Sequence, residues 1–225
     1  MLFEKHIKLK KKIINRNGLL KMNFYKQLKH VNEIDDGWAR KRAITCIKEL
    51  SKFISLTNLT ILVLGCGQGY ECEEWKRLKN RIVGADFNKD LLWHAKKNNS
   101  VDKIILCDLM EPINQKSESY DIVYCSEVFE HLPKLQPIIS EAKRILKNGG
   151  YFVITTDNPC GIRNMARMLW QDSRYFEVEG HLHYYSPKRL KKIMEDNGFR
   201  VISIKTIGNW VLPSLGDCYM LIAKK

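Results

Sequence analysis

Short apolar runs alternate with stretches of amphipathic helical spacing along most of the 225-residue chain. Compact runs rich in Ile, Val, Leu and Tyr are typical of buried strands. They predict strands over residues 60–64, 81–86, 103–107, 120–125, 151–156, 199–207 and 219–223. Apolar positions three and four residues apart predict helices within 22–56, 70–79, 88–98, 133–146 and 187–197. Residues 161–186 are aromatic and follow neither period, so we expect an irregular segment there.

The order of these elements predicts the fold class. Strands separated by helices favour a parallel sheet with helices on both faces. No helix is predicted between the last two strands, so we expect them to pair antiparallel. Helix-end signals agree with this division, because Asn88 and Ser186-Pro187 suit helix starts and Asn148-Gly149-Gly150 suits a helix end. The sequence therefore predicts a doubly wound α/β sheet of seven strands, mostly parallel, with an antiparallel last strand.

Charge is concentrated at the N-terminus. The net charge is +13, and six Lys and one Arg against one Glu place +6 of it on residues 1–22. We expect residues 1–21 to form a basic, flexible extension, with a basic amphipathic helix at a membrane surface as the alternative. The domain then covers residues 22–225, with helices in 22–56 and the α/β core in 57–225. A basic balance also suits a nucleic-acid partner, but a solvated lysine-rich surface is the favoured interpretation.

Hydropathy and cysteine usage predict the compartment. No run of about 18 apolar residues is present, so we expect no membrane-spanning helix. Lysines interrupt the apolar residues near the N-terminus, which argues against a secretory signal. The seven cysteines form no CxxC pair, and Cys66, Cys107 and Cys125 stand at predicted strand ends. Reduced, buried thiols and a cytoplasmic location are therefore expected.

A glycine-rich turn marks a candidate ligand site. Gly65, Gly67 and Gly69 follow the apolar run at 60–64 and precede a predicted helix. Asp86 ends the next strand, 21 residues after Gly65, where a carboxylate reaches both hydroxyls of a ribose. The GxGxG spacing differs from the GxGxxG that places a pyrophosphate at a helix N-terminus. A nucleoside ligand without phosphates suits this turn better, and an NAD-dependent oxidoreductase is disfavoured.

These segments resemble those of class I S-adenosylmethionine-dependent methyltransferases, including type 11, type 23 and ubiquinone-pathway O-methyltransferases. The turn resembles motif I, Tyr120–Leu132 the fourth-strand motif, Leu146–Gly150 the LKPGG segment, and His181–Pro187 an HxHxFS/TP segment. The resemblance implies a Rossmann-like fold and S-adenosylmethionine as cofactor, with Asp86 on the ribose and Asp108 on the adenine amino group. It implies a cofactor site formed by Gly65, Cys66, Gly67, Gly69, Asp86, Phe87, Cys107, Asp108, Leu109 and Ser126.

One position departs from the family pattern. Val63 stands where the family usually has an acid that helps to position the loop and the methionine end of the cofactor. Valine cannot do this, so another group, such as a water molecule or Glu127, takes over, or the cofactor affinity is lower. A non-catalytic scaffold that keeps the fold is a further alternative, against which Asp86 and Asp108 argue.

Histidines near the predicted crevice are the candidates for acid–base chemistry. His131 follows the fourth strand and is the first candidate base, and His181 and His183 on the irregular segment are the next. Glu127, Glu130 and His131 form an ExxEH cluster that would share one side of a helical turn. The cluster resembles those of metal-dependent O-methyltransferases and of small-RNA 2′-O-methyltransferases, which add a downstream histidine. We predict catalytic His131 and His181 without a bound metal.

The methyl acceptor is predicted from the resemblance to a class of methyltransferases, because no sequence motif identifies it. We expect O-methylation of a small molecule, with RNA 2′-O-methylation as the alternative, because no recognisable RNA-binding module is present. Aromatic residues are candidates for an acceptor pocket, above all those in the 170–185 stretch. The candidates are Trp38, Trp170, Tyr175, Phe176, Tyr184, Tyr185 and Trp210.

Overall fold

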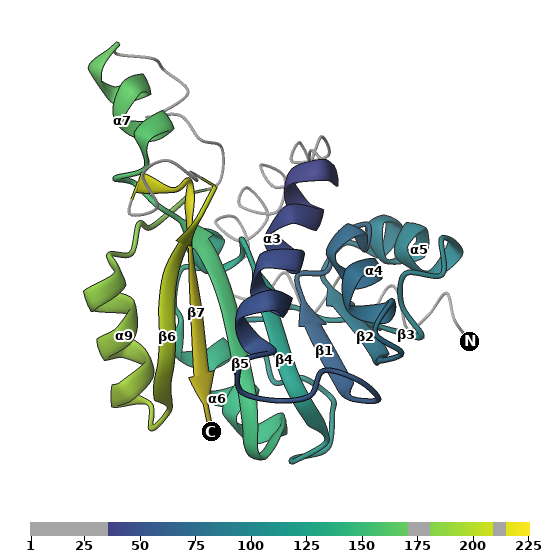
Figure 1. Cartoon of the computed structure of the whole chain (residues 1–225). Helices are drawn as coiled ribbons and strands as arrows, with labels where there is room; N and C mark the ends of the chain where they lie inside the picture. Colours follow the sequence, from purple (N-terminus) through teal and green to yellow (C-terminus); the bar gives the residue numbers. More distant parts are fainter. Residues whose placement is uncertain (1–35, 171–180, 209–214) are drawn as a thin grey trace, which may run out of the picture.

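The computed structural model describes residues 36–170, 181–208 and 215–225 (Figure 1). The expected extension 1–21, the helical prediction for 22–35, and Tyr175, Phe176 and Trp210 lie outside these residues. The elements are α3 (Asp36–Leu50), β1 (Thr60–Leu64), α4 (Tyr70–Lys76), β2 (Arg81–Asp86), α5 (Lys89–Lys97), β3 (Lys103–Leu106), β4 (Tyr120–Ser126), the 3₁₀ turn η1 (Phe129–His131), α6 (Gln136–Ile145), β5 (Leu146–Asp157), α7 (Ile162–Leu169), α9 (Pro187–Asp196), β6 (Arg200–Ile207) and β7 (Cys218–Lys224).

The strands form one sheet in the order β3-β2-β1-β4-β5-β7-β6. The pairs from β3 to β5 are parallel, whereas β7 lies antiparallel between β5 and β6. This arrangement confirms the predicted seven-stranded, mostly parallel α/β sheet with an antiparallel last strand. The chain order reverses at β1, since β2 lies on one side of β1 and β4 on the other. Such a switch point leaves a crevice at the carboxyl ends of the strands.

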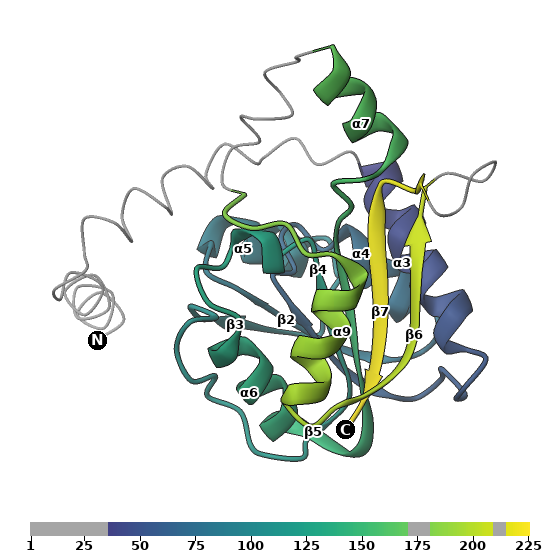
Figure 2. The same cartoon turned by 90° about the vertical axis from the view of Figure 1, so that its left-hand side faces the viewer.

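Helices cover both faces of the sheet, and each face has its own apolar core (Figures 1 and 2). Buried residues of α3, α4 and α5 pack on one face, around Trp75, Leu92 and Tyr124. Buried residues of α6 and α9 pack on the other face, around Ile138, Leu190 and Phe152. The middle strands are buried on both faces, which explains why their sequences are continuous apolar runs rather than alternating ones.

Local signals fix several helix ends as predicted. The side chain of Asn88 caps α5 by accepting hydrogen bonds from Asp90 N (3.0 Å) and Leu91 N (3.3 Å). Ser186 caps α9 by accepting from Arg189 N (3.3 Å), and Pro187 occupies the first turn, where a missing N–H costs nothing. These caps confirm the predicted starts of both helices.

Some predicted boundaries are wrong. The helix predicted over 133–146 runs only from Gln136 to Ile145, because Pro137 fits the first turn of a helix and not its interior. Asn148-Gly149-Gly150 is not its C-cap, since β5 already begins at Leu146. A Cβ on Gly150 would lie 3.0 Å from the carbonyl oxygen of Asp121, so glycine allows the strand to approach β4 there.

Other expectations also differ from the structure. Residues 162–169 form helix α7 instead of irregular chain, and α3 and α4 end at Leu50 and Lys76, before the predicted ends at 56 and 79. All seven cysteines are free thiols, as predicted. Cys66 and Cys125 are buried, but Cys107 is only partly buried because it lies beyond the end of β3.

Candidate active site

The glycine turn after β1 is hydrogen-bonded to the end of β2. Gly65 N and Cys66 N both donate to the carbonyl oxygen of Ala85, at 2.8 and 3.1 Å. Gly65, Gly67 and Gly69 have φ angles of 67°, 51° and 89°. These left-handed values suit glycine, and a Cβ on Gly65 would come within 2.4 Å of Val128 Cγ2. A Cβ on Gly67 would meet nothing within 4 Å, so open space lies beside the middle of the turn.

Asp86 joins this turn to the loop that follows β2. Its Oδ2 accepts from Gly67 N at 2.9 Å, and its Oδ1 accepts from Asn88 N at 2.8 Å. The side chain is 5% exposed. Burial raises the pKa of Asp86, and the backbone N–H groups of Asn88 and Gly67 act in the opposite direction. The structure therefore places a shielded carboxylate at the open side of the glycine turn.

Residues after β3 lie next to Asp86. Cys107 N donates to the carbonyl oxygen of Asp86 at 3.0 Å, and Met110 N donates to Asp108 Oδ1 at 2.9 Å. Burial raises the pKa of the Cys107 thiol to about 12, helped by the charges of Asp86 and Asp108. Phe87 is 37% exposed, whereas Leu109 is buried in the core. The predicted cofactor residues of β2 and β3 thus lie together, with Leu109 packing inward.

A buried polar network continues from β4, on the other side of β1. Ser126 Oγ donates to Glu71 Oε1 (3.0 Å) and shares a 2.7 Å hydrogen bond with Thr155 Oγ1. Arg42 Nε of α3 donates to the same Glu71 oxygen at 3.0 Å, and Thr155 Oγ1 donates to Glu127 Oε1 at 2.9 Å. Burial raises the pKa of Glu71, and burial raises the pKa of Glu127 to about 7. Of these residues, Ser126 was predicted from the sequence as part of the cofactor site, whereas Arg42 and Glu71 were not.

An acid and two histidines meet beyond the end of β4. Ligand atoms of Glu130, His131 and His181 all lie within 4.8 Å of one another. The rings of His131 and His181 contact edge to face, with centroids 4.7 Å apart. His181 Nδ1 lies 3.1 Å from Asp157 Oδ2 at the end of β5. The structure thus brings together the two predicted catalytic histidines, which are distant in sequence.

Glu130 anchors this cluster. Its carbonyl oxygen accepts from Leu182 N (2.7 Å) and His183 N (3.2 Å), which ties the segment after His181 to η1. Its buried side chain accepts from Thr156 Oγ1 at 2.8 Å, while Oε1 has no hydrogen-bond partner within the described residues. Burial raises the pKa of Glu130 well above its usual range, and the charges of Glu127 and Asp157 add to the effect.

The expected ExxEH arrangement is wrong in one respect. Glu127 has a φ of 52° and precedes the 3₁₀ turn, so it does not share a regular helical turn with Glu130 and His131. Its side chain accepts from Thr155 instead, and the group of potential ligands found among the described residues does not include it. His183 also lies apart from this group, near Tyr185 with ring centroids 5.9 Å apart.

The family of the chain is shown by its match to a known protein domain. A family described as a methyltransferase domain matches residues 36–204, which is more than half of the chain. The chain belongs to this methyltransferase family. The match includes the glycine turn, Asp86 and the cluster around His131.

Curated relatives of this methyltransferase carry O-methyltransferase names. It is 30% identical over 167 residues to the mitochondrial ubiquinone biosynthesis O-methyltransferase of Rattus norvegicus, covering 69% of this chain and 48% of the relative. It is 34% identical over 107 residues to the malonyl-[acyl-carrier protein] O-methyltransferase of Buchnera aphidicola, covering 48% of this chain and 43% of the relative. The chain spans about half the length of these curated relatives.

Solved structures share the fold of the methyltransferase. An S-adenosylmethionine-dependent methyltransferase from Archaeoglobus fulgidus matches with a TM-score of 0.64 at 20% identity, covering 89% of this chain and 99% of the other. One from Mesorhizobium loti matches with a TM-score of 0.62 at 16% identity, covering 78% and 94%. These likenesses agree with the Rossmann-like sheet described above.

Family membership implies S-adenosylmethionine as the cofactor, and the residues present fit it. The open space beside Gly67 borders the buried carboxylate of Asp86, which suits a ribose with two hydroxyls. Asp108 stands one strand further along, at the position that the resemblance assigns to the adenine. Val63, in contrast, is 2% exposed and packs in the apolar core, so this strand brings no carboxylate to the turn.

The aromatic acceptor candidates among the described residues differ in exposure. Tyr185 is 5% exposed and belongs to the core, so it is not a pocket residue in this structure. Trp170 and Tyr184 are exposed, by 79% and 39%, and Trp38 is partly buried beside Lys41. Among the described candidates, Tyr184 lies near the histidine cluster, with its ring centroid 6.0 Å from that of His181.

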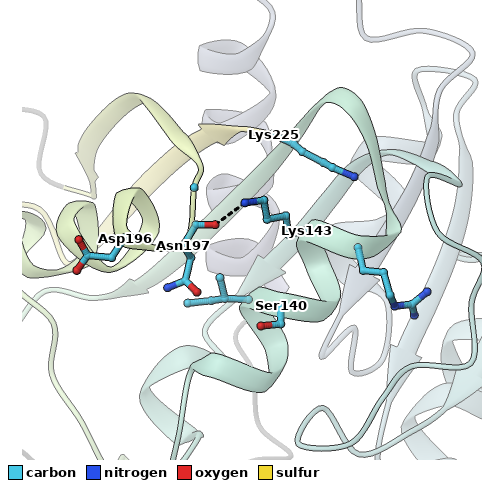
Figure 3. Close-up of a pocket in the computed structure, with 8 residues that line it drawn as sticks. Ser140, Lys143, Asp196, Asn197 and Lys225 are labelled. Carbon is cyan, nitrogen blue, oxygen red and sulfur yellow. Dashed lines mark hydrogen bonds between the residues drawn. The ribbon is translucent and has the colours of Figure 1, made fainter.

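A separate hollow lies between α6, α9 and the C-terminus (Figure 3). Lys143, Arg144 and Lys225 give it a basic lining, and Lys143 Nζ donates to the carbonyl oxygen of Asn197 at 2.8 Å. Lys225 Nζ donates to the carbonyl oxygen of Leu146 at the start of β5, so this hollow lies at the end of the sheet opposite to Asp86 and His131. It is not part of the candidate active site.

Proposed function

We propose that this methyltransferase transfers the methyl group of S-adenosylmethionine to a hydroxyl oxygen of a small-molecule acceptor. The observation that carries the proposal is the pairing of His131 with His181 at the carboxyl edge of the sheet, where Asp86 also ends its strand. The names of the curated relatives support oxygen as the accepting atom. Catalytic roles for His131 and His181, and the cofactor-binding roles predicted from the sequence, are part of this proposal.

The proposed reaction needs positioning more than covalent help. The acceptor oxygen forms a bond to the methyl carbon while the carbon–sulfur bond breaks, which leaves S-adenosylhomocysteine and the methyl ether. The hydroxyl proton passes to the imidazole of His131 as general base. His181, whose ring contacts that of His131, stands beside that base, with its Nδ1 at 3.1 Å from Asp157 Oδ2.

A metal-assisted version is the second candidate. One carboxylate and two imidazoles within 4.8 Å suit a divalent cation such as Zn²⁺ or Mn²⁺, and Glu130 Oε1 has no partner within the described residues. When bound, such a cation supplies Lewis-acid polarisation of the acceptor oxygen. In this version His131 is a ligand instead of the base, and Glu130 and His181 complete the set.

Chelation separates these two candidates. We expect EDTA treatment to leave the affinity for S-adenosylhomocysteine unchanged, because the glycine turn and Asp86 lie outside the histidine cluster. Full turnover in EDTA supports His131 as the base. Turnover that is lost in EDTA and restored by a divalent cation supports the three residues as ligands.

The acceptor class is tested with methyl-labelled S-adenosylmethionine. Hydroxylated aromatic compounds, carboxylic acids and total RNA are offered separately, and we expect label on a hydroxylated small molecule. Label on RNA alone, with turnover that falls steeply as salt rises, would contradict the proposal and support 2′-O-methylation. The formal charge of +13 and the ExxEH cluster of Glu127, Glu130 and His131 are the sequence features that favour this alternative.

The domain organisation belongs to the same proposal. We infer a basic extension over residues 1–21 and a methyltransferase domain over 22–225, in a cytoplasmic protein. The family match, which starts at residue 36, supports the position of the domain. Within the residues that the structure describes, no helix is both long enough and apolar enough to cross a membrane.

A further inference from the structure

Val63 lacks the carboxylate that the family usually has at this position. A carboxylate on another element of this chain lies in the same region. Val63 pairs with Tyr124 in the parallel register of β1 and β4, and both side chains belong to the core beneath α3 and α4. A carboxylate at position 63 would enter this same layer. The layer does contain a carboxylate, since Glu71 enters it from the first turn of α4.

Two residues from distant segments of the chain hold the Glu71 side chain in this layer. Arg42 Nε lies 3.0 Å from Glu71 Oε1, and the two side chains are 9% and 12% exposed. Ser126 Oγ donates to the same oxygen at 3.0 Å. The charge of Glu71 raises the pKa of the Arg42 guanidinium, while burial acts against it. The pair links α3 to α4, and Ser126 links both to β4, so removal of either charged partner would leave a shielded charge unpaired.

The strand order shows which part of the cofactor this network faces. Asp86 and Asp108 mark the ribose and adenine positions at the ends of β2 and β3, on one side of β1. Ser126 ends β4, on the other side of β1. The glycine turn lies between the two groups. A cofactor whose adenosine lies over β2 and β3 therefore extends its amino-acid end across the turn toward Ser126.

We propose that Glu71, fixed by Arg42 and Ser126, replaces the missing motif I acid and positions the amino-acid end of S-adenosylmethionine. The inference rests on the proposed cofactor site. Glu71 acts as a positioning residue, because it reaches the cofactor through Ser126 and the turn that starts α4. In this arrangement the carboxylate comes from α4 instead of β1, and Val63 packs in the apolar core.

The test compares two ligands that share adenosine and differ in the amino-acid end. S-adenosylhomocysteine carries that end, and 5′-methylthioadenosine lacks it. We expect Glu71→Ala to lower the affinity for S-adenosylhomocysteine by about tenfold or more and to change the affinity for methylthioadenosine by less than about twofold. Asp86→Ala is expected to weaken both ligands. A merely structural loss at Glu71 would weaken both ligands equally and would overturn the inference.

Glu73→Ala is the matched control on the same helix. Glu73 bonds to Ser100 (3.0 Å) and Arg40 (2.7 Å), outside the network, so the ratio of the two affinities is expected to stay unchanged. If Glu71→Ala does not fold, Glu71→Gln keeps the side-chain volume and removes only the charge. A normal affinity ratio in the folded Gln variant would then contradict the inference.

An exchange of the acid between the two positions gives a second test. In the unchanged protein, Val63→Asp buries another carboxylate beside Glu71 and is expected to destabilise the fold. In the Glu71→Ala background the same substitution is expected to restore affinity for S-adenosylhomocysteine, so the two substitutions are coupled. If Val63→Asp changed the affinity for S-adenosylhomocysteine equally in both backgrounds, the inference would be overturned. If neither ligand binds the unchanged protein, the cofactor site itself fails, and the inference fails with it.

Discussion

Gly67 donates its backbone N–H to Oδ2 of Asp86 across 2.9 Å, and this hydrogen bond fastens the turn after β1 to the end of β2. The acid therefore does two things in the proposed site. It holds the glycine turn in its left-handed conformation and presents a carboxylate to the open space beside Gly67. Both roles depend on the same side chain, so they are expected to be lost together.

Asp86→Ala is expected to abolish measurable binding of S-adenosylhomocysteine. The substitution removes the ribose acceptor and leaves the N–H groups of Gly67 and Asn88 without their acceptor, at a cost of about 1–3 kcal/mol in stability. Calorimetric titration measures the first effect and urea unfolding the second. Near-normal affinity in this variant would mean that the cofactor site lies elsewhere.

Gly67→Ala and Gly65→Ala distinguish an obstructed ligand site from a clash within the protein. Gly67 has open space where a Cβ would lie, so the left-handed φ of 51° costs about 1 kcal/mol, while the methyl group obstructs the cofactor. Gly65→Ala meets Val128 and is expected to lose about 1–3 kcal/mol more. Thermal unfolding with and without S-adenosylhomocysteine distinguishes the two. Full cofactor affinity in the Gly67 variant would argue against a ligand beside this turn.

His131→Ala is expected to reduce turnover by about 10²–10⁴-fold and to leave cofactor affinity nearly unchanged. Its ring contacts His181 beyond β4, outside the turn that holds Asp86. His183→Ala is the control, because His183 is exposed and lies outside the cluster. The measurement is the turnover number at saturating cofactor with the acceptor found in the labelling screen. Equal turnover in the two variants would remove His131 from the mechanism.

Glu127 is expected to make stability fall as pH rises. Burial raises its pKa from 4.5 to about 7 in the folded state, so the native protein binds more protons than the unfolded chain between these values. This contribution to the free energy of unfolding therefore decreases from about pH 4.5 to 7 and is constant above. Glu127→Gln is expected to remove a decrease on the order of 2 kcal/mol between pH 5 and 8.

Urea unfolding at pH 5 and pH 8 checks this expectation against a matched exposed carboxylate. Glu195→Gln on α9 is the control, because its side chain is 48% exposed and its ion pair with Lys191 is long, at 3.7 Å. The control variant should follow the pH profile of the unchanged protein. A Glu127→Gln profile parallel to the unchanged one would show that Glu127 is ionised throughout.

Periodicity was sufficient where local sequence decides the structure. The strands at 60–64 and 81–86 and the cap at Asn88 lie where the apolar runs and the N-cap preference place them. The start of β5 was misplaced, at residue 151 instead of Leu146, because Asn148-Gly149-Gly150 satisfies a helix C-cap and a close strand entry equally well. Only the pairing of Tyr120 with Leu146 selects the strand, and that contact spans 26 residues.

The candidate site was predictable only in part, for a related reason. The glycine turn and Asp86 follow a known spacing, and the structure brings them within one hydrogen bond. The pair of Arg42 and Glu71 spans 29 residues and joins two helices, so neither residue stands out in the sequence. The signal that was available is the valine at position 63, because the absence of the family's usual acid points to a charge on another element as one alternative.

The most direct test of the cofactor site is a calorimetric titration of the unchanged protein with S-adenosylmethionine and S-adenosylhomocysteine, with NAD as the control. We expect micromolar binding of both sulfur compounds and no binding of NAD, because the GxGxG turn and Asp86 suit a nucleoside without a pyrophosphate. Binding of NAD alone, or of none of the three compounds, would contradict the assignment of this site to S-adenosylmethionine.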